Sequence, residues 1–80
     1  MMVSVRLFAS FAEILGFSEL EMELPDGARV NDVMTRLSAL PGGHRLPPSP
    51  LLAVNLSYAT PETPLDGGDE VAIIPPVAGG

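Results

Sequence analysis

The sequence contains no cysteine and no lysine, and each absence excludes a kind of chemistry. Without cysteine, the chain can form neither a disulfide nor a thiolate metal site. Four arginines stand against ten acidic residues, a net charge of −6, so a nucleic-acid partner is disfavoured because few cations would displace its counterions. The apolar runs are far too short for a membrane span, and the N-terminus lacks an export signal. These absences predict a cytoplasmic protein with neither nucleic-acid nor membrane partners.

The chain has 80 residues, 46% of them apolar, which predicts one domain over residues 1–80 with an efficient core. Two segments alternate strictly between apolar and polar residues, the signature of half-buried strands. In residues 2–9 the apolar set is Val3, Val5 and Leu7, and in residues 18–24 the inward residues alternate with three glutamates. Both segments are therefore predicted to be strands of one sheet.

Two helices are predicted between the strands. Ser10 is expected to cap a short helical segment that Gly16 closes in a left-handed conformation. Asn31 is expected to cap the main helix, with Asp32 favourably placed in its first turn. The main helix carries apolar residues at helical spacing, namely Val30, Val33, Met34, Leu37 and Leu40. One stripe of this helix should therefore pack on the sheet.

Residues 41–50 contain four prolines and two glycines, which predicts an irregular loop. The one histidine, His44, lies there without a cysteine or second histidine to complete a metal or catalytic site. We expect it to be an ordinary exposed residue. Beyond the loop, residues 51–56 and a segment from Tyr58 read as short strands, with Asn55 tolerating the reversal between them. Residues 71–74 form a last apolar strand, and Leu65 is a predicted core residue.

This order of elements predicts an α+β fold, in which a sheet of four to five strands is crossed by one main helix. The first and last strands are expected to be neighbours near its centre, because both are strongly apolar and need cover. Pro75 and Pro76 cannot continue a central ladder and should send residues 75–80 outward as an extended, flexible tail.

The sequence ends on Gly79 and Gly80. Because neither residue has a Cβ, this backbone can pass a narrow channel, and the terminal carboxylate is left unshielded. The alternative is an ordinary frayed terminus. If the carboxylate were activated, the absence of lysine would leave no side-chain amine for conjugation to another copy of the chain.

A docking surface is predicted from strand parity. Phe8 points away from the face of Val3, Val5 and Leu7, and Ile74 points away from Val71 and Ile73. If the two strands are neighbours, Phe8 and Ile74 share the face opposite the main helix, with Tyr58 beside them. An exposed apolar patch near a reactive end is typical of a partner site. The alternative is that a loop or the short helix covers these side chains.

The chain resembles the small subunit of molybdopterin synthase, a MoaD-type sulfur carrier of the MoaD/ThiS ubiquitin-like family. The resemblance runs from Val3 to Gly80. It rests on the segments Arg6-Leu7-Phe8-Ala9, Glu13-Ile14-Leu15-Gly16, Leu24-Pro25-Asp26-Gly27-Ala28, Ala53-Val54-Asn55 and, above all, the tail from Asp69 to Gly80. Two features depart from the family pattern: Ala12 stands where a basic residue is common, and the loop at 41–50 is unusually rich in proline.

The resemblance implies a β-grasp fold with a mixed sheet, and a protein that is not an enzyme by itself. An E1-like adenylyltransferase would adenylate Gly80, a sulfur donor would convert it to a thiocarboxylate, and the tail would deliver sulfur to a pterin precursor in the large subunit, within a heterotetramer. ATP and the donor belong to the activating machinery, so no cofactor or metal is expected on the chain. Partner-binding positions would be Phe8, Tyr58, Ile74, Pro75, Pro76 and Val77, with Gly79 passing the channel.

Three alternatives remain open at this point. A carrier with the same tail chemistry could serve a thiamine thiazole precursor or tRNA thiolation. A ubiquitin-like modifier would instead form isopeptides on target lysines. A plain interaction module would make no use of Gly80.

Overall fold

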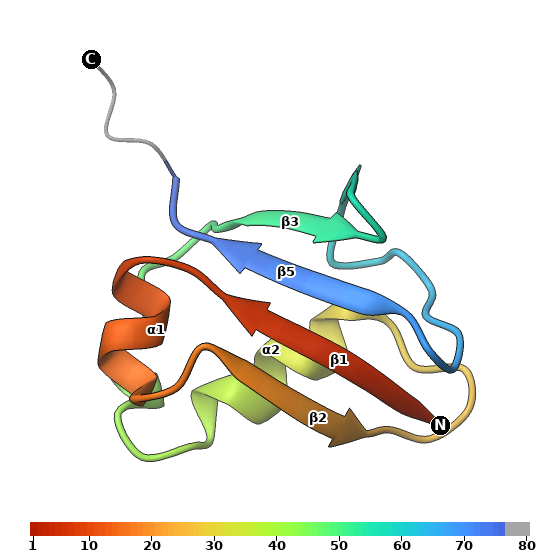
Figure 1. Ribbon diagram of the computed structural model, residues 1–80, viewed down its shortest axis with the longest axis horizontal. Helices are drawn as coiled ribbons and strands as arrows, with labels where there is room; N and C mark the ends of the chain where they lie inside the picture. Colours follow the sequence, from red (N-terminus) through yellow and green to blue (C-terminus); the bar gives the residue numbers. More distant parts are fainter. Residues whose placement is uncertain (77–80) are drawn as a thin grey trace.

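A mixed sheet crossed on one face by a single long helix makes up the body of the protein. The computed structural model describes residues 1–76 of the chain (Figure 1). In chain order its elements are β1 (Met2–Leu7), α1 (Ser10–Leu15), β2 (Glu19–Glu23), α2 (Val30–Ser38), the 3-10 helix η1 (Gly43–Arg45), β3 (Leu51–Val54), β4 (Ser57–Ala59) and β5 (Glu70–Ile74). The α+β class predicted from the sequence is confirmed.

The strands are ordered β2-β1-β5-β3-β4 across the sheet. β1 and β5 run parallel, with Val5 opposite Val71 and Leu7 opposite Ile73. The other pairs are antiparallel. The first and last strands are therefore neighbours, as predicted, and the parallel pairing needs the long crossover that α2 supplies.

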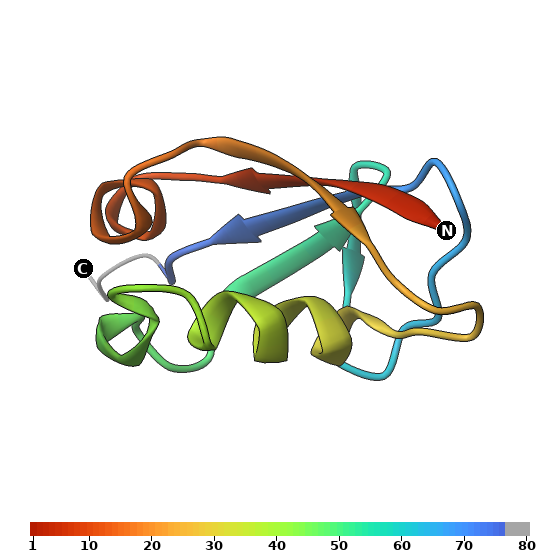
Figure 2. The ribbon, with the colours of Figure 1, turned by 90° about the horizontal axis from the view of Figure 1, so that it is seen from below.

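The core lies between the sheet and α2, which crosses one face of it (Figure 2). The apolar side chains on one face of the strands pack against the apolar stripe of α2. Fully buried are Val3, Val5, Phe11, Val30, Val33, Leu37, Val71 and Ile73, and Leu65 is nearly so. On β2 the glutamates face water while Met22 and Leu24 are buried. Both alternating patterns therefore predicted the correct faces.

Both predicted helix caps are wrong by one or two positions. The cap residue of α2 is Arg29, and Asn31 is already helical. The Asp32 carboxylate accepts from the Arg29 N–H at 2.7 Å, and the N–H groups of Val30 and Asn31 donate to the carbonyls of Thr63 (3.0 Å) and Pro61 (2.9 Å) in a distant loop. The cap residue of α1 is Ala9 instead of Ser10, whereas Gly16 closes that helix at φ 85° as predicted.

The proline-rich segment at 41–50 is more regular than the sequence predicts. It contains η1, and Gly43 is buried where this segment turns back on the end of α2. A Cβ at Gly43 would meet the carbonyl oxygens of Leu37 and Ser38. Leu46 packs against the core from the same segment. This part of the loop therefore closes the open end of the core.

Candidate functional site

The end of β5 fixes the point at which the tail leaves the body. Ile74 is still paired with Leu51 on one side of β5, and the N–H of Phe8 donates to the Ile73 carbonyl on the other, at 3.2 Å. Pro75 follows half-buried and Pro76 exposed, and neither can donate a ladder hydrogen bond. The site residues Val77, Gly79 and Gly80 predicted from the sequence lie outside the described residues. The body thus holds the strand firmly up to the residue before the prolines.

A shallow apolar hollow lies on the sheet face opposite α2, beside this exit. We call it the sheet-face hollow; its apolar lining is Phe8, Ala53, Leu56, Tyr58, Ala72 and Ile74, and Arg6 and Glu70 border it. The structure brings together Phe8 and Ile74, which parity predicted, and Tyr58, which was expected beside them. Phe8 is 42% exposed and Tyr58 86% exposed, and Ile74 is half-buried. Within residues 1–76, neither a loop nor α1 covers the hollow.

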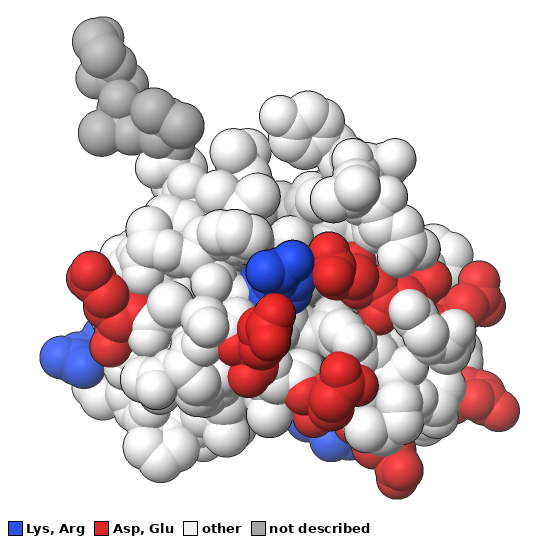
Figure 3. All heavy atoms as spheres, viewed as in Figure 1, with Lys and Arg blue, Asp and Glu red and all other residues white. Residues whose placement is uncertain are grey.

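Charges are distributed unevenly over this face. Figure 3 shows acidic side chains over its lower and right-hand parts, whereas the region over β3 and the end of β5 is uncharged. Arg6 lies at the boundary. Its guanidinium is 3.5 Å from Glu19 and 3.9 Å from Glu70, and 6.0 Å from the centre of the Phe8 ring. The hollow is therefore an apolar surface whose charged border, Arg6 and Glu70, consists of one cation and one anion paired with each other.

The β3–β4 turn, which carries one wall of the hollow, is fastened to the start of β5. The Asn55 backbone N–H donates to the Glu70 carbonyl at 2.9 Å, and its side-chain oxygen accepts from the Glu70 N–H at 3.0 Å. The Asn55 amide also donates to the Asp69 carboxylate at 2.9 Å. The backbone N–H of Asp66, and then the Asn55 amide, lower the pKa of Asp69 by stabilising its charged form.

Sequence reasoning did not identify Leu56 as a residue of this surface. The predicted reversal at Asn55 is confirmed, but the strand predicted over residues 51–56 ends at Val54, and Leu56 lies in the turn with Asn55. The available signal was turn chemistry: the asparagine marks a reversal directly before an apolar residue. Ala53 and Ala72 were also missed, although their parity matches that of Tyr58 and Ile74 across the sheet.

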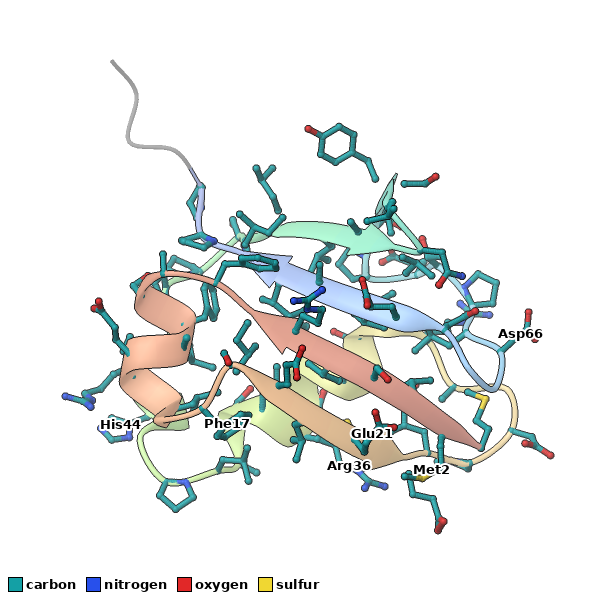
Figure 4. All side chains as sticks on the ribbon, in the orientation of Figure 1. Met2, Phe17, Glu21, Arg36, His44 and Asp66 are labelled. Atoms are coloured by element: carbon teal, nitrogen blue, oxygen red, sulfur yellow. The ribbon has the colours of Figure 1, made fainter. Side chains whose placement is uncertain are left out.

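The rest of the described chain offers little other chemistry. Within residues 1–76 no three metal-ligating side chains gather to hold an ion. His44 is exposed, and Figure 4 shows it at the edge of the molecule beside α1, far from the labelled acids Glu21 and Asp66. Over the same residues, no helix has the length and apolar character that crossing a bilayer requires.

The element order, the parallel β1–β5 pair and the single crossing helix define the ubiquitin-like β-grasp fold. The chain belongs to the ThiS family, whose profile matches residues 5–80. This confirms the resemblance to the MoaD/ThiS family that was predicted from the sequence.

Two relatives match along their whole length. A molybdopterin synthase sulfur carrier subunit from Chlamydomonas reinhardtii is 37% identical over 83 residues, with 100% of both chains covered. Small archaeal modifier protein 3 from Haloferax volcanii is 33% identical over 94 residues, again with 100% of both covered. The chain is therefore similar to a sulfur carrier subunit and to a protein modifier.

Two solved structures show the same fold. The crystal structure of SAMP1 from Haloferax volcanii has a TM-score of 0.84 at 25% identity and full coverage of both chains. A complex of subunits 1 and 2 of the molybdopterin-converting factor from Helicobacter pylori matches with a TM-score of 0.72, also at 25% identity and full coverage.

Proposed function

We propose that the protein is the sulfur carrier of molybdopterin synthesis in the molybdenum cofactor pathway, acting as the non-catalytic small subunit of molybdopterin synthase. The full-length 37% identity to a subunit of that name carries the proposal. The strand exit at Pro75 and Pro76 beside the sheet-face hollow supports it, because a carrier needs a docked body and a projecting end. The protein is then a co-substrate that works in the cytoplasm.

The proposed reaction takes place at the carboxylate of Gly80. A carboxylate is a poor electrophile, so an oxygen of Gly80 first attacks the α-phosphate of ATP, and pyrophosphate leaves. A sulfur nucleophile from a donor then displaces AMP and leaves a thiocarboxylate. When that sulfur is transferred to the pterin precursor, oxygen from water restores the carboxylate. ATP and the donor belong to an E1-like adenylyltransferase and its partners, so the chain itself binds no cofactor.

The folded body supplies position and reach. β5 stays paired through Ile74, and the six residues from Pro75 onward span roughly 20 Å when extended at about 3.3 Å each. That length is enough to enter a partner's active site while the body remains outside. Gly79 and Gly80 would pass the narrowest part of the channel, because they lack a Cβ.

The sheet-face hollow is the proposed docking surface for the adenylyltransferase and for the large subunit. Phe8, Tyr58 and Ile74 would supply the apolar contacts, and Pro75, Pro76 and Val77 would continue the interface along the tail. An exposed apolar patch of this kind on a small domain is typical of an interaction site. The similarity to subunit 1 of a two-subunit complex supports this role. A heterotetramer is the proposed assembly.

Intact mass tests the proposal against its competitor. The purified protein is incubated with an E1-like adenylyltransferase, ATP and a sulfur donor, with ATP omitted as the control. A carrier gains the mass difference of one oxygen exchanged for one sulfur, mapped to Gly80. No change in mass, with the adenylyltransferase active on a known carrier, would contradict the proposal.

The competing function is protein modification, which the 33% full-length identity to a small archaeal modifier protein favours. Activation of Gly80 would be the same, but the product would be an isopeptide on a lysine of another protein. Ladders of conjugates on added target proteins, in place of the sulfur mass gain, would establish the modifier.

A further inference from the structure

The turn between β3 and β4 places a leucine where the backbone favours glycine. Val54 pairs with Ser57, which leaves Asn55 and Leu56 as a two-residue loop with φ 50° and 70°. Such a loop needs positive φ at both residues, and Asn-Gly is its favoured sequence. Asparagine tolerates this region well, but a leucine side chain crowds its own backbone there. Leu56 therefore carries a conformational cost at a site where glycine would be free of it.

This cost is not repaid by burial within the described chain. Leu56 is 92% exposed, more than any other large apolar residue within residues 1–76. Three hydrogen bonds hold the neighbouring Asn55 to Asp69 and Glu70, so the turn cannot easily relax. The backbone of the turn thus places Leu56 at the sheet-face hollow, next to Tyr58, which is 86% exposed. An exposed apolar side chain on a strained turn, whose backbone is fixed by hydrogen bonds, is typical of a contact residue for a binding partner.

We propose that Leu56 is a binding anchor that inserts into an apolar pocket on the large subunit. This inference rests on the proposed function, because it takes the partner that receives the tail as the occupant. Ile74 lines the same hollow and is followed by Pro75, Pro76 and the four residues that carry the reactive end. A protein that accepts that end comes within reach of the hollow and of the hairpin beside it, because the tail leaves the body there.

The charged groups at the border of the hollow bear on which partner surface fits it. The border of the hollow carries Glu70, and Glu19 lies across Arg6 from it. The matching surface is an apolar pocket for Leu56 and Tyr58, with polar groups at its edge that meet the Arg6–Glu70 pair. A second copy of this chain fits less well, because two chains that each carry a net charge of −6 repel one another.

The test compares two substitutions that relieve the same kind of backbone strain. Leu56→Gly removes the side chain, and Leu56→Asn replaces it with a polar group that tolerates positive φ. The matched control is Ser49→Gly, because Ser49 is an exposed residue at φ 53° that does not line the sheet-face hollow. Calorimetric titration against the purified large subunit gives the affinity, thermal unfolding gives Tm, and sedimentation gives the oligomeric state.

We expect both Leu56 variants to bind the large subunit about tenfold more weakly or worse, with Tm equal to or above that of the wild type. Ser49→Gly should keep wild-type affinity. Unchanged affinity in both Leu56 variants overturns the inference, as does an equal loss in Ser49→Gly. A wild-type dimer that Leu56→Gly dissociates also overturns it, because the occupant would be a second copy. If the wild type itself fails to bind the large subunit, the proposed function fails instead.

Discussion

Replacing Phe8 with alanine separates a docking role from a core role. Phe8 is 42% exposed, so somewhat more than half of the residue is covered by the protein. Full burial of such a side chain stabilises by roughly 3 kcal/mol, and the covered part of Phe8 therefore corresponds to about 1–2 kcal/mol of unfolding free energy. For a domain of this length, that loss lowers Tm by roughly 4–16 °C. The variant should still be folded at room temperature.

Phe8→Ala is also expected to weaken binding to the large subunit, by a free energy that can exceed its loss of unfolding free energy. An apolar hot spot contributes about 1–4 kcal/mol, which is roughly a 5- to 1000-fold weakening of Kd. Calorimetric titration of Phe8→Ala against the large subunit measures it. The control is Ile73→Val, because Ile73 is fully buried on the opposite face and the change costs about 0.5–1.5 kcal/mol. Two variants of similar stability should then differ strongly in affinity.

The reasoning is refuted by one pattern of results. If Phe8→Ala keeps wild-type affinity while its Tm falls far more than that of Ile73→Val, the ring is a core residue. The interface with the large subunit must then lie elsewhere on the molecule.

Further predictions concern the tail, the acid stability and the loop. Deleting Gly80, adding one residue after it, or changing Gly79 to valine should abolish sulfur transfer and leave Tm nearly unchanged, and sulfur transfer by any of the three would refute the carrier chemistry. Because the pKa of Asp69 is lowered, its stabilisation is complete above the usual value of 3.8 and is lost as the pH falls through the lower folded value. Asp69→Asn should thus be less stable than the wild type in urea at neutral pH, and the difference should shrink in acid; a constant difference would be contrary to this. Gly43→Ala should destabilise the fold by about 1–3 kcal/mol, because the added Cβ meets the end of α2. Replacing residues 47–50 with a Gly-Ser linker should leave sulfur transfer intact. Urea midpoints and transfer rates check both loop variants.

Much of the fold could be predicted because its strands are half-buried and α2 is amphipathic. The alternation in β1 and β2 and the stripe on α2 report directly which faces are buried. Parity also placed Phe8 and Ile74 on the outer face, which depends only on the pleat of neighbouring strands. These features are local, so a single sequence contains them.

The errors have three separate causes. The start of α2 is satisfied by carbonyls of Pro61 and Thr63, about thirty residues further along the chain, and no local cap signal records that. Gly43 is buried because η1 packs on α2, whereas the sequence around it predicted an irregular loop. Leu56 looked like the end of a strand, because an apolar residue in a tight turn contradicts the usual turn preferences. Such a local contradiction is itself a signal of a binding site.

The most direct test of the account is sulfur delivery by the charged carrier. The protein is prepared as the Gly80 thiocarboxylate with radiolabelled sulfur and mixed with the purified large subunit and the pterin precursor, without ATP. The account predicts that label moves to the pterin and that the carrier returns to its unmodified mass, with a large-subunit-free mixture as the control. Label that stays on the carrier, or that moves equally well without the large subunit, would contradict it.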